Sequence, residues 1–341
     1  MPESGVRVFT DPDRYMEQIR NVSAWQVMRP SAVETVKGVL TRSGAFRAEL
    51  TRIDLHRLGM SRGDESLPRL LKITLSGSRC VILFTTDPDR PAMLINGVET
   101  SQDRIATFEL NSEIYVRSVA ACKWGAMSLT PEDLAAVGEA IIGRELAPPL
   151  FPHTIAPPAP ALSRLLKLHE AAGHLAKTAP DILAKPEVAR AMEQALVEAM
   201  VLCLAGVDAP HVRHVHRYHA TVMRRLEVVL EANSDGALYM ADLCAAAKVS
   251  YATLLACCHE YLGMGPKRYL LLRRMHLARQ ALRRAEPERT TVTEIATDYG
   301  FWELGRFSVA YRSLFGESPS RTLRSNPGET AGRRNNFVKS A

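Results

Sequence analysis

The pattern of apolar and polar residues between positions ~45 and ~130 predicts short strands. The stretch FRAELTRIDLHRL alternates apolar and polar residues, and RLLKITLSG, RCVILFTT, RIATFEL and EIYVRSVAACKWGAMSL follow as further β-rich runs. Between them, AMLINGVET contains Asn96-Gly97, the residue pair favoured in a two-residue hairpin turn. We expect roughly six to eight strands, at spacings typical of a sandwich or barrel.

A helical period replaces this alternation after a proline-rich segment, APPLFPHTIAPPAPA, at 147–161. Helices are predicted at 161–179, at 186–206 and from about residue 212 to 232, with Pro186 at a first turn, where proline is well tolerated. The apolar stripes at about 160–205 suit either of two roles, covering the β-rich domain or forming a homodimer seam.

The last third is predicted to be almost entirely helical. We expect helices at about 239–247, 250–262, 266–285, 291–298, 303–315 and 318–325. The tail NPGETAGRRNNFVKSA, 326–341, lacks an apolar period and is predicted to be disordered. The expected fold class is therefore α+β and multidomain: a β-rich domain (1–150), a helical linker or dimerisation segment (151–221), an all-α domain (222–325) and the tail.

Composition and charge narrow the class of protein. The 341 residues are 46% apolar and 23% charged, and no apolar run approaches the ~18 residues that span a bilayer. The N-terminus has no apolar signal core, and six cysteines without framework spacing suit reduced thiols, so we expect a cytoplasmic protein that does not enter a membrane. Residues 1–221 hold 25 Lys/Arg and 25 Asp/Glu, whereas residues 222–341 hold 18 and 12. The basic last third indicates a nucleic-acid partner, although a solvated positive face gives the same charge.

An internal repeat lies in this basic third. DLCAAAKVSYATLLACCHEYLGMGP, from Asp242, resembles EIATDYGFWELGRFSVAYRSLFGESP, from Glu294. A shift of 53 places Leu254 on Phe307, Cys258 on Tyr311, Gly263 on Gly316 and Pro266 on Pro319; upstream, Leu243 and Cys244 match Ile295 and Ala296 at a shift of 52. One extra residue therefore lies in the second turn.

Each copy has the features of a helix-turn-helix unit. A small residue, Cys244 or Ala296, allows the second helix to cross closely, and Gly-x-x-Pro ends that helix and starts the next. Gly300 permits a left-handed turn residue in the second copy. The first copy has Lys248 there, which costs about 1 kcal/mol if its backbone is left-handed.

These motifs resemble the DNA-binding region of AraC/XylS family transcription regulators. The resemblance covers about residues 222–325, is most specific in TVTEIATDYGFWELGRFSVAYRSLFGESP, and includes the connecting helix GPKRYLLLRRMHLARQALRR. It implies two helix-turn-helix units joined by a long helix, a cupin-like N-terminal domain that binds a small effector, promoter DNA and RNA polymerase as partners, and a possible homodimer. It implies no enzymatic activity and no cofactor.

The first recognition helix is predicted to bury its cysteines. Leu254, Cys257, Cys258 and Tyr261 share one face, and free cysteine packs as a small hydrophobe. Adjacent helical residues point ~100° apart, which is poor geometry for two thiolates that bind one metal ion. A redox role requires an exposed thiol in an electropositive environment, and none is evident.

The opposite faces carry the candidate DNA contacts. Family members commonly have arginines where this chain has Ala252 and Ala256, so Thr253 and His259 are left as contacts to a base and a phosphate. In the second copy, Arg306 is expected to read a base and Arg312 to bind a phosphate, and Thr291 and Ser318 are candidate helix caps. The full set of predicted DNA-binding residues is Ser250, Tyr251, Ala252, Thr253, Ala256, His259, Lys267, Arg268, Trp302, Glu303, Arg306 and Arg312.

Two other classes of function compete with this hypothesis. A cupin-like metalloenzyme with an appended DNA-binding module requires clustered histidines, but the β-rich region contains only His56. The segment HVRHVHRYH (211–219) is a weak candidate metal sensor, and Trp124 and Cys122 are candidates for a pocket or for the core. An architectural DNA binder without effector control is the third alternative.

Overall fold

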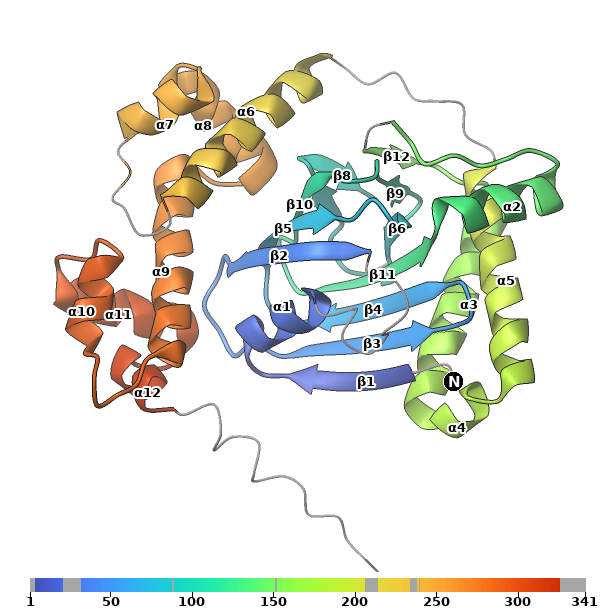
Figure 1. The fold of residues 1–341 in the computed structure, drawn as a ribbon, viewed down its shortest axis with the longest axis horizontal. Coiled ribbons are helices and arrows are strands. Elements are labelled where there is room, and N and C mark those ends of the chain that lie inside the picture. Colours follow the sequence, from blue (N-terminus) through green and yellow to red (C-terminus); the bar gives the residue numbers. More distant parts are fainter. Residues whose placement is uncertain are drawn as a thin grey trace, which may run out of the picture. The chain divides into compact units, whose positions relative to one another are not determined.

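The computed structural model describes residues 4–20, 32–87, 89–150, 152–205, 214–233, 238 and 240–325. The chain forms two compact units, and the boundary between them falls at Ala220/Thr221, apart from two short segments. The fold is mixed: the first unit is rich in strands and the second is helical (Figure 1).

Two antiparallel sheets build the first unit. The larger has the strand order β1 (Ser4–Phe9), β3 (Ala48–Asp54), β4 (Gly59–Glu65), β11 (Cys122–Leu129), β6 (Cys80–Thr85), β9 (Ile105–Thr107) and β12 (His153–Ile155). The smaller has the order β2 (Val33–Leu40), β5 (Arg69–Leu75), β10 (Glu113–Arg117), β7 (Met93–Ile95) and β8 (Val98–Thr100). Asn96 and Gly97 both have positive φ, 50° and 81°, in the hairpin between β7 and β8, as predicted.

The strand prediction was too low for this region. Nine strands, β3 to β11, lie between residues 48 and 129, because two of the predicted runs contain two strands each and β4 lies outside every predicted run. The sequence pattern also missed β1, β2, β12, α1 (Pro12–Arg20) and α2 (Pro131–Ile142).

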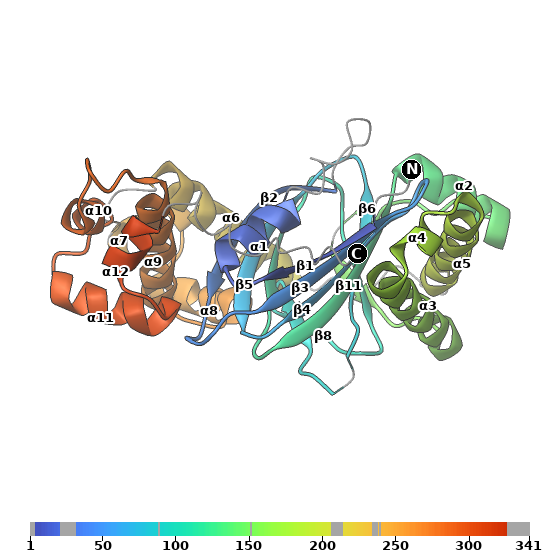
Figure 2. The ribbon, with the colours of Figure 1, turned by 90° about the horizontal axis from the view of Figure 1, so that it is seen from below.

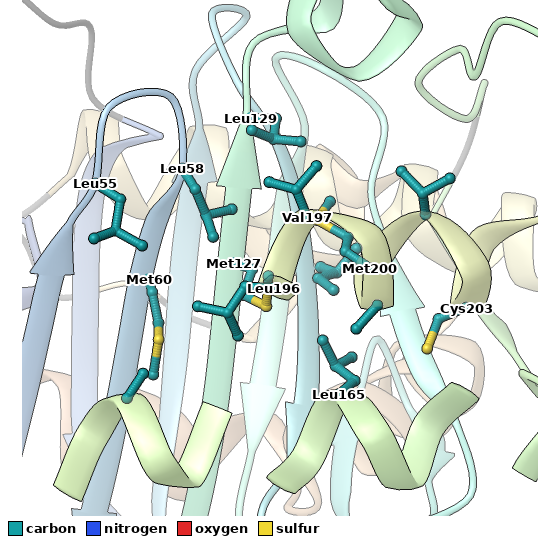
Figure 3. Close-up of a cluster of buried hydrophobic side chains, with 14 of the residues drawn as sticks. Leu55, Leu58, Met60, Met127, Leu129, Leu165, Leu196, Val197, Met200 and Cys203 are labelled. Carbon is teal, nitrogen blue, oxygen red and sulfur yellow. The ribbon is translucent and has the colours of Figure 1, made fainter. Parts of the chain in front are cut away.

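Helices cover the outer face of the larger sheet. α3 (Ala159–Thr178), α4 (Pro180–Leu183) and α5 (Pro186–Leu204) lie along it together with α2 (Figure 2). The apolar stripes of α3 and α5 form one core with the sheet, in which Leu165, Leu196 and Met200 meet Met60 and Met127 (Figure 3). Of the two roles predicted for these stripes, the structure therefore shows the covering of the sheet.

A buried charged cluster joins the two sheets. Glu65, at the end of β4, accepts hydrogen bonds from Tyr15 of α1 and Trp124 of β11, each at 2.6 Å, and from Nη2 of Arg69 of β5 at 2.9 Å. Cys122 lies 3.9 Å from the same carboxylate. Burial opposes the charge of Arg69, but the neighbouring Glu65 carboxylate raises the pKa of that guanidinium above its ordinary value. Removing one partner would leave the other charge buried without compensation, so these elements are held in one arrangement.

The second unit contains the basic part of the chain. Its helices are α6 (His214–Ala232), of which the first turns belong to the other unit, α7 (Met240–Ala247), α8 (Tyr251–Leu262), α9 (Pro266–Arg284), α10 (Val292–Asp298), α11 (Leu304–Phe315) and α12 (Pro319–Arg324). Each helix after residue 239 begins and ends within one or two residues of its predicted position. The predicted tail, 326–341, lies outside the described residues.

Candidate nucleic-acid interface

The internal repeat corresponds to two helix pairs, α7/α8 and α10/α11, joined by α9. In the first pair, α7 and α8 cross at 84°. The matched positions are buried alike: Leu243 and Ile295, Leu254 and Phe307, Cys258 and Tyr311. The repeat was therefore a correct guide to which side chains form the interior of each pair.

The two turns have the same backbone conformation despite different residues. Lys248 has φ 57° and Gly300 has φ 74°, which confirms the left-handed position in both. Val249 N–H donates to the carbonyl of Cys244 at 3.1 Å, and Phe301 N–H donates to that of Ala296 at 2.9 Å. The next matched residues, Ser250 and Glu303, stand directly before α8 and α11.

This correspondence identifies the extra residue of the second turn as Trp302. It lies between Phe301 and Glu303, and its side chain is 76% exposed. The second pair therefore presents a tryptophan in the turn just before its second helix, whereas the first pair has no residue at that position.

Local capping signals set the helix ends. Thr291 and Glu294 form a reciprocal capping box, and the Ser318 hydroxyl accepts from Arg321 N–H at 3.2 Å, so both predicted caps are confirmed. Gly263 and Gly316 have φ of 70° and 74° where α8 and α11 end. The prolines three residues after these glycines, at 266 and 319, open α9 and α12.

Both cysteines of α8 lie in its interior. Cys257 and Cys258 are fully buried, and burial raises the pKa of Cys258 to about 12. A thiol that is neither exposed nor ionised packs as a small hydrophobe, as predicted. Over the part of the chain that the structure describes, no three His, Cys, Asp or Glu side chains are grouped to hold a metal ion.

The exposed face of α8 is formed mainly by small side chains. Ala252, Ala256 and His259 are exposed, as are Ser250 and Tyr251 at the helix start, while Thr253 is half-buried. Lys267 and Arg268 are exposed in the first turn of α9. Of the predicted DNA-binding residues in α8 and at the start of α9, all except Thr253 are therefore exposed.

The exposed face of α11 carries longer and more strongly charged side chains than that of α8. The Arg306 side chain is 82% exposed, and its Nη1 donates to Oε2 of Glu303 at 2.7 Å. Such an exposed pair contributes little to stability and is readily exchanged for another anionic partner. Arg312, two turns further on, is also exposed.

One residue of this face was missed in the sequence. Val309 is 73% exposed and lies on the same side of α11 as Arg306. An exposed valine gives no local signal, but the shift of 53 places it on Ala256, which was among the predicted contacts.

Part of the basic charge of α9 is used inside the unit. Arg273 donates to the carbonyl of Leu230 at 2.7 Å, and Arg279 is paired with Glu317 at 3.4 Å. Arg274 donates to the Gly300 carbonyl at 3.3 Å, and burial lowers the pKa of its guanidinium. The basic excess therefore overstates the charge that is open to a nucleic acid. Arg274 and Arg279 hold the second helix pair against the connector, and Arg273 holds α6 against it.

A buried polar pair fixes α6 on α9. The Tyr269 hydroxyl donates to Oε1 of Glu227 at 2.9 Å, and both residues are buried. Of the histidine-rich segment, the side chains at 211, 214 and 216 lie outside the described residues; Nδ1 of His219 lies 2.5 Å from Oε2 of Glu260.

The first unit holds a cavity of about 110 Å³ between its two sheets. Its lining is mainly apolar and includes Met93, Phe108 and Trp124, with Arg52 and Asp54 among its polar residues. Trp124 is thus both a core and a lining residue, whereas Cys122 is buried in the core without lining the cavity. Within the described ranges, no single helix has the length and apolar content to cross a membrane, and only α7 and α8 together, bent by 84°, meet that criterion as a pair.

Comparison with known proteins identifies the C-terminal region. Residues 243–325, which contain both helix pairs except the first three residues of α7, match the family model of a helix-turn-helix domain. The chain is 32% identical over 167 residues to a probable thc operon regulatory protein of Rhodococcus erythropolis, a match that covers 48% of this chain and 49% of that one. It is 36% identical over 107 residues to a XylDLEGF operon transcriptional activator of Pseudomonas putida, covering 31% and 33% of the two chains.

Among solved structures, a probable AraC family transcriptional regulator from Rhodopseudomonas palustris is 31% identical, with 31% of this chain and 98% of that chain covered and a TM-score of 0.28. The chain spans about half or less of the length of the two curated relatives named above. The match to the family model spans the repeat, the connector and the capped helix ends. The C-terminal domain of this chain is therefore a helix-turn-helix domain of the kind found in AraC/XylS family transcription regulators.

Proposed function

We propose that this chain is a sequence-specific regulator that binds promoter DNA through two helix-turn-helix units, α7/α8 and α10/α11. The observation that carries the proposal is the repeated pair itself. In each copy the second helix packs one face inward and leaves the opposite face exposed, the geometry that places a recognition helix in a major groove.

The two recognition helices contribute differently in this proposal. Arg306 of α11 reads a base edge, for which the fork of the guanidinium suits guanine, and Arg312 binds a phosphate. α8 lacks such side chains at Ala252 and Ala256, so it adds affinity through the backbone and the groove shape, with Thr253 and His259 as minor contacts.

The connector makes simultaneous binding by both units feasible. α9 has 19 residues, which at about 1.5 Å per residue is roughly 28 Å. Successive major grooves on one side of a duplex are about 34 Å apart. One chain therefore has the reach to contact two neighbouring grooves, and a homodimer would extend the site further.

The first unit is the proposed regulatory part. Its two facing sheets suit a cupin-like domain, and the apolar cavity between them suits a small effector. Contact with RNA polymerase and a location at the nucleoid are further parts of the proposal, which follow from the family and from no single residue.

Salt-dependent binding tests the proposal. The full chain is titrated with the duplex that it enriches from a random-sequence pool and with a scrambled duplex of the same length. We expect at least about a thousandfold preference for the selected duplex at physiological salt, and affinity for both that falls as salt rises. Equal affinity for the two duplexes at every salt concentration would contradict sequence-specific regulation.

A further inference from the structure

The exposed face of α11 carries one large apolar side chain, Val309, beside its arginine, and Trp302 is exposed in the turn before the helix. Val309 follows Arg306 by three residues, so the two lie at neighbouring positions of one face. Every other large apolar side chain of α11 is at least partly buried: Leu304, Phe307, Tyr311, Leu314 and Phe315. Val309 is therefore the exception to an otherwise amphipathic helix.

Val309 contributes little to the stability of the folded domain. A β-branched residue in the middle of a helix has lower helix propensity than alanine, because its side chain loses rotamer freedom. At 73% exposure it also buries little apolar surface. A single exposed valine is ordinary on a protein surface, but this one occupies the middle of the face that the proposed function turns toward the bases.

The flanking charges show which partner suits this apolar group. Arg306 and Arg312 lie on either side of Val309 along α11, so any partner has to be anionic and to present an apolar group between its charges. In the major groove, the C5-methyl of thymine is the one apolar group displayed by the four base pairs.

We propose that Val309 reads a thymine by apolar contact with its C5-methyl group, while Arg306 reads a base close to it. This inference rests on the proposed function and adds the base that the second unit selects. Val309 follows Arg306 by three residues, a rise of about 4.5 Å along the helix, which is close to the ~3.4 Å step between stacked bases. The matched position of the first unit is Ala256, whose single methyl group reaches less far, so the thymine preference belongs to α11.

Removal of one methyl group from the DNA tests the contact. In the duplex that the full chain selects from a random pool, each thymine is replaced in turn by deoxyuridine, which pairs identically but lacks the methyl group. We expect one thymine at which the wild-type chain loses about fourfold in affinity, the effect of exposing one buried methyl-sized group. Val309→Ala should lose a similar factor on the thymine duplex and should no longer distinguish thymine from deoxyuridine there.

A matched variant separates this contact from a general effect of losing a valine. Val228 of α6 is 62% exposed, and Val228→Ala should keep the full distinction between thymine and deoxyuridine. The thermal midpoint of Val309→Ala should equal or exceed that of the wild type, because alanine is the better helix former.

The outcomes also separate this inference from the function on which it rests. If the chain selects a duplex but tolerates deoxyuridine at every position, or if Val309→Ala discriminates as the wild type does, the thymine contact is wrong and sequence-specific binding stands. If no duplex is enriched at all, both proposals are wrong.

Discussion

The two helix pairs of the C-terminal unit share their buried residues and differ in their exposed ones. The interior positions match in burial, and each turn contains one residue in the left-handed conformation. On the outside, α8 presents Ala252 and Ala256, whereas α11 presents Arg306 and Val309 and is preceded by the exposed Trp302. The comparison shows that packing constrains the interior of a repeat, while its outer face is open to specialisation in one copy.

The interiors themselves are filled unequally, and this gives the largest expected effect. Tyr311 is fully buried and its hydroxyl donates to Oγ1 of Thr322 at 2.9 Å, whereas the matched Cys258 fills a smaller volume. Tyr311→Ala should lower the free energy of unfolding by about 3–5 kcal/mol, the range for truncating a buried aromatic side chain. Cys258→Ala should cost about 1 kcal/mol, because it removes a single sulfur atom. Urea denaturation followed by the helical circular dichroism signal measures both, and equal losses would contradict an unequal interior.

The exposed faces give the next largest effect. Arg306→Ala should relax sequence preference by about 1–3 kcal/mol, the contribution of one bidentate base contact. Thr253→Ala, at the matched position of the first pair, should change it by less than about 0.5 kcal/mol, since Thr253 is half-buried and short. Titrations with the selected duplex and with its single-base variants measure the preference. Comparable losses from the two substitutions would show that both helices read sequence.

Substitutions in the two turns should change the free energy of unfolding least, and with opposite signs. Lys248→Gly should raise the free energy of unfolding by up to about 1 kcal/mol, because glycine adopts φ 57° without steric cost. Gly300→Ala should lower it by about 1 kcal/mol or more. The backbone φ of Gly300 is 74°, and an added Cβ would lie 2.9 Å from Nη1 of Arg274. Changes of the same sign in thermal unfolding would show that the two turns are not equivalent.

Local chemistry explains why the helical third was predictable. The signals that end and start these helices act within a few residues of the helix end, so they can be recognised directly in the sequence. They are the capping residues, the glycines after α8 and α11, and the prolines that follow them. The same holds for the Asn96-Gly97 hairpin. Val309 was not predicted as a contact, because its exposure depends on the packing of the whole helix pair. Trp302 was among the predicted contacts, but only the backbone of the two turns identifies it as the extra residue.

The β-rich unit was less predictable because its determinants are distant in sequence. Alternation predicts strands but not their order, and β3 pairs with β1, which lies about 40 residues earlier, across α1 and β2. Glu65 reads as an exposed acid beside a turn, yet it is fully buried because Tyr15 and Trp124 reach it from other elements. No signal near Glu65 indicates those partners.

The uninterrupted connector α9 sets the rotation of the second helix pair relative to the first about the axis of the connector. Between its first residue and Arg284 it contains no glycine or further proline, so it transmits rotation as well as distance. One inserted residue would turn the second pair by about 100° relative to the first, and an insertion of about seven residues would restore the angle while adding roughly 10 Å. A chain built in this way tolerates changes in its outer faces far more readily than changes in the length of this one helix.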